Sequence, residues 1–210
     1  MSYLSIFCLS FTVALSGALM PGPLLTTVIA RSAGTGFSAG PLVSLGHALL
    51  EGLLLTGLVF GLGGLMRLPV FVITATLAGS FLLITMGIHM LLTLGRVTIG
   101  SAKARRADPL KLIADGIVVS AVNPYWSIWW VTIGLGLAMT AGKAGVPGVA
   151  VFFCGHILAD FLWYSSVSFL VSSRRSFIST KAYRAILCAC ALALVFFGVY
   201  FVIRLPSNVG

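Results

Sequence analysis

Two short, similar stretches of this chain each place an acid inside a long apolar run. GHALLEG covers residues 46–52 and GHILADF covers residues 155–161. Each starts with Gly-His and carries an acid four residues after the histidine, Glu51 in the first and Asp160 in the second. Residues four apart share one face of a helix. Each stretch therefore predicts a histidine beside a carboxyl group on one helix face.

Three kinds of chemistry fit a histidine beside a carboxyl group. Imidazole titrates near neutral pH, so the pairs His47 with Glu51 and His156 with Asp160 could accept, hold and release a proton. The same four residues could also form a metal site, because two imidazoles and two carboxylates suit zinc or a similar ion. In a purely structural interpretation, each histidine only satisfies its acid. We favour proton or substrate handling, with the metal site as the alternative.

Acids are scarce in this chain, which makes their positions informative. There are four, Glu51, Asp108, Asp115 and Asp160, and only Glu51 and Asp160 fall in the middle of apolar runs. A charged carboxylate at the centre of a bilayer costs about 2.5–3.5 kcal/mol on the insertion scale. No Lys or Arg lies in the same runs, so each acid must be protonated, face water or bind a cation. A protein that alternates among these states is a transporter.

Prolines interrupt two other apolar runs. Pro21, Gly22 and Pro23 form a PGP stretch, and Asn123 precedes Pro124. Proline removes a backbone donor and disfavours a helical residue before it, so we predict a helix break at each site. A new half-helix then begins with free N–H groups and a positive dipole end, which suits a carboxylate. A kink that serves only packing is the alternative.

The breaks and the acids together predict a site for a zwitterion. A half-helix N-terminus would hold the carboxylate, and Glu51 or Asp160 would hold the ammonium group. An aromatic cluster follows the second break and consists of Tyr125, Trp126, Trp129 and Trp130. Some of these residues could gate a cavity or stack on a substrate, but we favour bulky packing or an interfacial belt.

Composition places these residues in a polytopic, all-α membrane protein. The 210 residues are 59% hydrophobic and only 8% charged, which no soluble domain of this size could bury. Six apolar runs are each long enough to cross a bilayer. They cover residues 3–29, 38–64, 69–94, 111–141, 146–172 and 182–204.

An internal repeat organises the six predicted spans. PGP in the first span and GHALLE in the second are matched by the Asn-Pro break in the fourth and GHILAD in the fifth. We therefore predict a three-helix repeat over 1–95, a basic linker over 96–110 and a second three-helix repeat over 111–210. Because three spans is an odd number, the two repeats must cross the membrane in opposite senses, as in many secondary transporters.

The basic residues predict the orientation. With six spans, ten of the thirteen Lys and Arg residues fall in the connections on one side of the membrane, at 31, 96–111 and 174–184, and three on the other. The positive-inside rule makes the basic side cytoplasmic, so both termini are expected outside the cytoplasmic membrane. This placement also argues against nucleic acid as the partner of the basic charge.

The chain resembles the LysE/RhtB-type amino-acid exporters. The resemblance rests on PGP in the first span, an acid shortly after a glycine in the second, Asn-Pro in the fourth, and six spans in about 210 residues. It implies export of amino acids or their analogues by proton exchange, with Pro21, Gly22, Pro23, Glu51, Asn123 and Pro124 as pore elements. GHALLE departs from the Gly-Asp pattern of many members, and the wider superfamily includes cadmium-resistance exporters.

We therefore expect a secondary transporter that exports amino acids or related small metabolites by proton antiport, with the bilayer, the substrate and protons as its partners. No cofactor and no enzymatic activity are expected, and homo-oligomers are compatible with the sequence. A divalent-cation exporter is the alternative within the same class. From other classes, the rivals are a membrane enzyme or thiol-redox carrier and a structural subunit. The redox version is disfavoured because no Cys flanks either break. A structural subunit is disfavoured because two matched intramembrane acids give a scaffold no obvious advantage.

Overall fold

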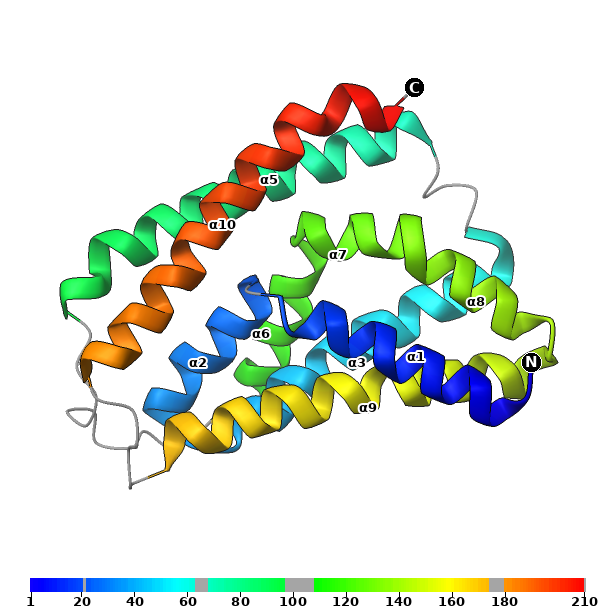
Figure 1. Cartoon of the computed structure of the whole chain (residues 1–210), viewed down its shortest axis with the longest axis horizontal. Coiled ribbons are helices and arrows are strands. Elements are labelled where there is room, and N and C mark those ends of the chain that lie inside the picture. The colour runs from blue at the N-terminus through cyan, green and yellow to red at the C-terminus, as the bar shows by residue number, and fades with distance from the viewer. Residues whose placement is uncertain (21, 63–67, 97–107, 174–179, 210) are drawn as a thin grey trace.

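The computed structural model describes residues 1–20, 22–62, 68–96, 108–173 and 180–209, and every regular element among them is a helix (Figure 1). The helices in chain order are α1 (Tyr3–Ala18), α2 (Pro23–Thr35), α3 (Ala39–Gly57), η1 (Leu58–Leu62), α5 (Pro69–Thr93), η2 (Leu94–Arg96), α6 (Pro109–Ala121), α7 (Pro124–Trp129), η3 (Trp130–Gly134), α8 (Leu135–Gly142), α9 (Gly145–Ser172) and α10 (Thr180–Val209). The expected all-α class is confirmed.

The helix break predicted at the PGP stretch is present. α1 ends at Ala18, and α2 starts at Pro23 with its axis bent by 71° from that of α1. Gly22, the N-cap residue of α2, has an extended backbone with φ −137° and ψ 178°. Proline is well placed at the first helical position because the N–H it lacks would be unpaired there anyway. Pro21 lies outside the described residues.

The second predicted break is also present. α6 ends at Ala121, Asn123 is extended, and α7 restarts the helix at Pro124. The chain then continues through the five-residue π-helix η3 into α8. The predicted fourth span, 111–141, is therefore two helical pieces that meet at Asn123.

Helix length and composition support fewer spans than the six predicted. α3, α9 and the part of α5 from Thr76 to Thr93 are long and apolar enough to cross a membrane, and the bent pair α1–α2 makes a fourth if counted as one span. α6 to α8 do not meet this criterion because the break divides them into short pieces. In α10 the apolar helix from Leu187 to Ile203 is also shorter than the criterion requires.

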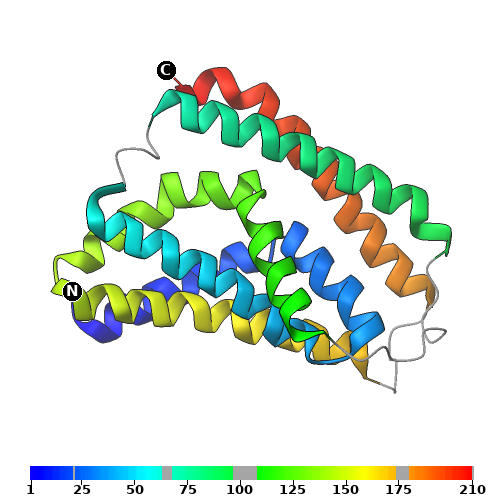
Figure 2. The same cartoon turned by 180° about the vertical axis from the view of Figure 1, so that it is seen from behind.

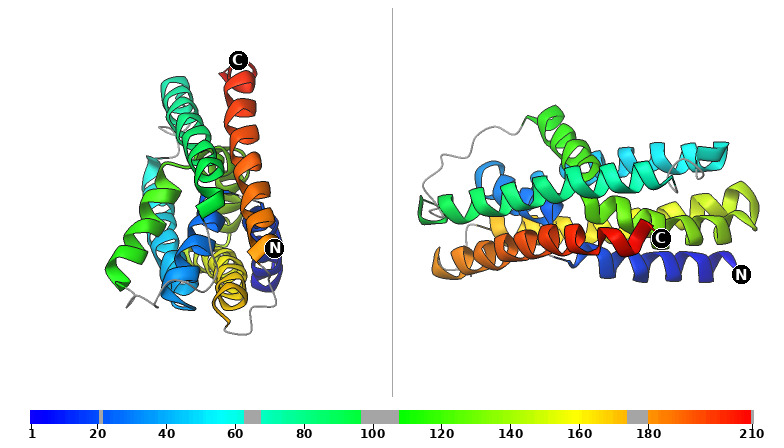
Figure 3. Two further views of the ribbon diagram at one scale, coloured as in Figure 1. Left: turned by 90° about the vertical axis from the view of Figure 1, so that its left-hand side faces the viewer. Right: turned by 90° about the horizontal axis from the view of Figure 1, so that it is seen from above.

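Three helix pairs make up most of the packing. α1 runs along α9, α3 along α6, and α5 along α10. The α5–α10 pair forms one side of the molecule, while α1, α3 and α9 form the other, with α7 between them (Figures 1 and 2). The long helices lie roughly along one axis, and some of them run in opposite senses (Figure 3). The ends of α2, α5 and α9 gather opposite the N-terminus, as does the start of α10.

A glycine lets each Gly-His motif approach a neighbouring helix closely. A Cβ atom on Gly46 would overlap the carbonyl oxygen of Ile113 in α6. A Cβ atom on Gly155 would lie 2.7 Å from the carbonyl oxygen of Phe7 in α1. Small residues at such contacts let helix backbones approach in membranes. Each motif thus fixes its histidine beside one helix of the other half of the chain.

An ion pair joins two of the half-helices. The Nε atom of Arg31 in α2 lies 2.7 Å from Oδ2 of Asp115 in α6, and both side chains are partly exposed. α2 follows the first break and α6 precedes the second. The pair therefore ties together the two pieces that lie toward the end of the molecule opposite the N-terminus (Figure 1).

We expect Gly46→Ala to lower the thermal midpoint of the purified protein in detergent. The added methyl group must push α3 away from α6, and overpacking of this kind costs about 1–3 kcal/mol. The matched control is Gly136→Ala in α8, where an added Cβ meets nothing within 4 Å. Equal midpoints for Gly46→Ala and wild type would contradict the close approach of α3 and α6.

Candidate functional site

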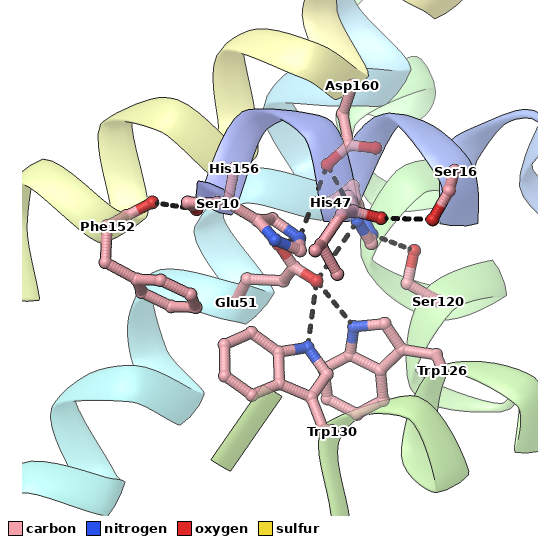
Figure 4. Close-up of polar contacts among 11 residues, drawn as sticks. Ser10, Ser16, His47, Glu51, Ser120, Trp126, Trp130, Phe152, His156 and Asp160 are labelled. Atoms are coloured by element: carbon pink, nitrogen blue, oxygen red, sulfur yellow. Dashed lines mark hydrogen bonds and ion pairs between the residues drawn. The ribbon is translucent and has the colours of Figure 1, made fainter. Parts of the chain in front are cut away.

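The four titratable residues of the two Gly-His motifs lie together in the interior. His47 and Glu51 come from α3, and His156 and Asp160 come from α9. All four are buried, with Glu51 only 1% exposed and Asp160 only 4%. Figure 4 shows them turned toward one another between the two helices. Residues separated by more than a hundred positions thus form one cluster, which we call the His–acid cluster.

Both histidines contact both acids. His47 Nε2 lies 3.3 Å from Glu51 Oε1 and 3.7 Å from Asp160 Oδ2. His156 Nε2 lies 3.0 Å from Glu51 Oε2 and 3.6 Å from Asp160 Oδ2. The sequence predicted a histidine beside the acid of its own helix. The contacts across helices, between His156 and Glu51 and between His47 and Asp160, come from the packing of α3 against α9.

Two tryptophans of the aromatic cluster contact Glu51 in addition to packing in a hydrophobic core. Trp126 Nε1 donates a hydrogen bond of 3.0 Å to Glu51 Oε1, and Trp130 Nε1 donates one of 2.9 Å to the same oxygen (Figure 4). The two residues are four apart, so both indoles lie on one face of the helix that follows the second break. That spacing was the available signal, but nothing in the sequence tells which acid the face meets.

Ser120 is a second polar partner that the sequence analysis missed. Its Oγ lies 2.7 Å from His47 Nδ1, on the side of the ring away from the acids. His156 has no equivalent contact: its Nδ1 is buried without a hydrogen-bond partner among the described residues. Ser120 stands four residues before Pro124, and the residue four before Pro21 is Gly17, which has no side chain to offer. The two histidines therefore differ in their outer partner.

A small cavity joins the His–acid cluster to both helix breaks. Its volume is about 60 Å³, which is enough to admit water. The lining includes the four cluster residues, Gly22 and Asn123 from the breaks, and the aromatic rings of Tyr125, Trp126, Trp129 and Tyr164. Unwound backbone at membrane depth is tolerated where it lines such a cavity.

The two half-helices that begin at the breaks differ at their N-termini. The N-terminus of α7 is capped by Asn123, whose Oδ1 accepts a hydrogen bond of 3.1 Å from the Tyr125 N–H. No side chain caps α2, and Leu24 and Leu25 of its first turn line the cavity. The free N–H groups of a first helical turn attract anions. The sequence predicts two anion sites, one at the N-terminus of each half-helix. Only at α2 does the N-cap residue leave the first-turn N–H groups without a side-chain hydrogen bond.

Only some of the predicted break residues line the cavity. Gly22 and Asn123 line the cavity, whereas Pro23 and Pro124 start the helices behind them. Pro21 is outside the described residues. The remaining acids are elsewhere: Asp108 caps α6, and Asp115 pairs with Arg31.

The geometry could also accommodate a metal ion. One ligand atom from each of the four cluster residues lies within 4.8 Å of the other three. In a tetrahedral site with bonds of about 2.0–2.1 Å, adjacent ligand atoms are about 3.3 Å apart. The four His–acid distances range from 3.0 to 3.7 Å, with those to Glu51 ending on Oε1 for His47 and on Oε2 for His156. The arrangement can therefore hold protons, an ammonium group or a divalent cation.

Comparison with known proteins gives one family and one curated relative. The model of the family described as LysE type translocator matches residues 15–205. The chain is 24% identical over 199 residues to the "Putative amino acid efflux protein YcgF" of Bacillus subtilis (strain 168), covering 94% of this chain and 95% of that protein. No solved structure matches the chain.

We expect Ser120→Ala to destabilise the protein. The change leaves His47 Nδ1 buried without its partner, and an unpaired buried polar group costs about 1–3 kcal/mol. Thermal unfolding in detergent measures the effect. Ser16→Ala is the control, because the exposed Ser16 hydroxyl donates only to the Val13 carbonyl of its own helix. If both variants unfold at the wild-type temperature, the Ser120 contact contributes nothing.

Proposed function

Because the chain belongs to the LysE type translocator family, we propose that it exports amino acids or related small metabolites across the cytoplasmic membrane in exchange for protons. The observation that carries the proposal is the His–acid cluster, buried beside a cavity that reaches both helix breaks. The relative named for amino acid efflux supports this cargo class.

We further propose a six-span architecture of two inverted three-helix repeats. The helix pairs support it, because exchanging the halves converts the α1–α9 contact into the α6–α3 contact and leaves α5–α10 unchanged. The two breaks and the two Gly-His motifs correspond in the same way. In this arrangement the ends of α2, α5 and α9 and the start of α10 are cytoplasmic, and both termini are outside.

The His–acid cluster is the proposed coupling site. Two buried carboxylates need about two positive charges to be neutral, and no Lys or Arg lies beside them in α3 or α9. Protons on the two imidazoles can supply these charges, and so can the ammonium group of a cargo together with one proton. Cargo and protons would then occupy the site in turn, which is the requirement for antiport. Each charge moved is worth about 2.3 kcal/mol per 100 mV.

The uncapped N-terminus of α2 is the proposed site for the cargo carboxylate. Leu24 and Leu25 line the cavity that also contains the two acids. A zwitterion could therefore place its carboxylate at α2 and its ammonium group at the cluster, with aromatic rings between them. The capped N-terminus of α7 is the weaker anion site, since Asn123 already occupies it.

A divalent-cation exporter is the second candidate, favoured by the four His–acid distances of 3.0 to 3.7 Å. In that case the cation would be the cargo and His47, Glu51, His156 and Asp160 its ligands. One divalent charge would balance the two carboxylates as well as two protons do.

The test is exchange in vesicles of purified protein with a pH dye trapped inside. One set receives gradients of individual amino acids, and the other receives zinc or cadmium. We expect amino-acid gradients to move protons, and Glu51→Gln and Asp160→Asn each to slow this movement at least about tenfold, because each removes a charged partner of the cluster.

The matched control is Asp108→Asn, an equal carboxyl-to-amide change outside the cluster. Asn caps helices as well as Asp does, so this variant should exchange at the wild-type rate. Proton movement driven only by metal would favour the cation exporter. Proton movement that survives both cluster variants would overturn the role of the two acids.

A further inference from the structure

The two acids of the His–acid cluster are held very differently. Glu51 Oε1 accepts hydrogen bonds from two indoles, and each oxygen of Glu51 has an imidazole nitrogen within 3.3 Å. Glu51 Oε2 and Asp160 Oδ2 are both buried and make no hydrogen bond among the described residues. They differ in their imidazole neighbours: His156 Nε2 lies 3.0 Å from Glu51 Oε2, whereas the imidazole nitrogens beside Asp160 Oδ2 are 3.6 and 3.7 Å away. The motifs that contain the two acids are similar, so this difference comes from what surrounds them.

The indole donors have fixed positions. Trp130 is completely buried, and its ring packs edge-on against Phe152 and Trp129. Trp126 lies one turn earlier, next to the break at Asn123 where the capped N-terminus of α7 sets the direction of the helix. An indole N–H can only donate, so the oxygen that faces both of them must stay an acceptor.

The first half of the chain offers Asp160 no such donors. Trp126 and Trp130 stand two and six residues after Pro124, the first residue of α7, and the residues two and six after Pro23, the first residue of α2, are Leu25 and Ile29. Neither leucine nor isoleucine has a side-chain donor. The two acids therefore differ in their indole donors because only the half-helix after the second break carries tryptophans at these positions.

We propose that Trp126 and Trp130 are positioning residues that hold Glu51 as a fixed anchor for both imidazoles, and that Asp160 is the carboxylate that binds the ammonium group of the cargo. This inference rests on the proposed function, since it assigns different roles to the two acids of the same exporter site. If Glu51 turned its Oε1 toward a cargo, it would leave the buried donor of Trp130 and the half-buried donor of Trp126 unpaired. Asp160 gives up no hydrogen bond at Oδ2 when it binds a cation.

The indole N–H groups themselves provide the test, because the chain has only four tryptophans. Protein labelled with ¹⁵N-tryptophan and placed in nanodiscs gives four indole resonances, which single Trp→Phe variants assign. We expect the Trp126 and Trp130 resonances to move in Glu51→Gln, where the acceptor loses its charge. The Trp163 resonance should stay in place, because its buried Nε1 has no partner among the described residues.

Ethylammonium serves as the probe for the ammonium group. We expect it to bind the wild type and not Asp160→Asn, as followed by saturation transfer from protein to probe. At saturating ethylammonium the Trp126 and Trp130 resonances should keep their positions, because Glu51 Oε1 keeps accepting both indole hydrogen bonds. These measurements do not depend on transport, so they separate a failure of this inference from a failure of the exporter proposal.

Transport gives the second readout, with the amino acid that drives exchange in wild-type vesicles. The double variant Trp126→Phe/Trp130→Phe keeps one aromatic ring at each position but removes both donors. We expect its maximal exchange rate to fall at least about tenfold while the KM for the amino acid stays within about twofold, because Glu51 does not touch the cargo. Trp163→Phe, the matched control, should exchange at the wild-type rate.

Several results would overturn the proposal. One is that ethylammonium moves the Trp126 and Trp130 resonances to their positions in Glu51→Gln, which would make Glu51 the cargo carboxylate. Others are unmoved resonances in Glu51→Gln, ethylammonium binding that survives Asp160→Asn or is absent from the wild type, and full exchange by the double tryptophan variant. If Glu51→Gln fails to insert, Glu51→Asp replaces it, since the shorter side chain keeps its charge but withdraws it from the indoles.

Discussion

The burial of two carboxyl groups among apolar helices is the constraint on which the rest of this structure depends. Glu51 and Asp160 lie in the interior, and the charged form of each costs about 2.5–3.5 kcal/mol at bilayer depth. The cluster offsets this cost with groups that are polar but not permanently charged, namely two imidazoles and two indole N–H groups. A permanent cation beside each acid would remove the cost but would also leave no place for an exchangeable charge.

Close helix contacts and helix breaks satisfy this constraint together. Gly46 and Gly155 bring α3 against α6 and α9 against α1, so the histidine that follows each glycine reaches the interior. The breaks at Gly22 and Asn123 end two helices at the level of the cluster, where they line one small cavity. Polar backbone, titratable side chains and a small cavity therefore coincide, as the proposed exchange of protons and cargo requires.

The same fold makes two similar halves chemically unequal. His47 has a hydrogen-bond partner in Ser120, while the residue that corresponds to Ser120 in the first half of the chain is Gly17, which has no side chain. Glu51 has two indoles, while the other half-helix has none to offer Asp160. A carrier that binds protons and cargo at one site benefits when its two carboxyl groups differ. One carboxyl group can then hold the geometry of the site while the other exchanges its bound cation.

The sequence by itself determined the membrane class, the positions of both breaks and the four residues of the cluster. These follow from local physics: apolar runs need a bilayer, proline breaks a helix, and an acid in such a run must be compensated. Only the tertiary structure decided which groups compensate which acid. The contacts of Glu51 with His156, Trp126 and Trp130 join residues at least 75 positions apart. No periodicity encodes such pairs, since they depend on how α3, α7 and α9 pack, and this packing gives Glu51 two indole donors in addition to its imidazole neighbours.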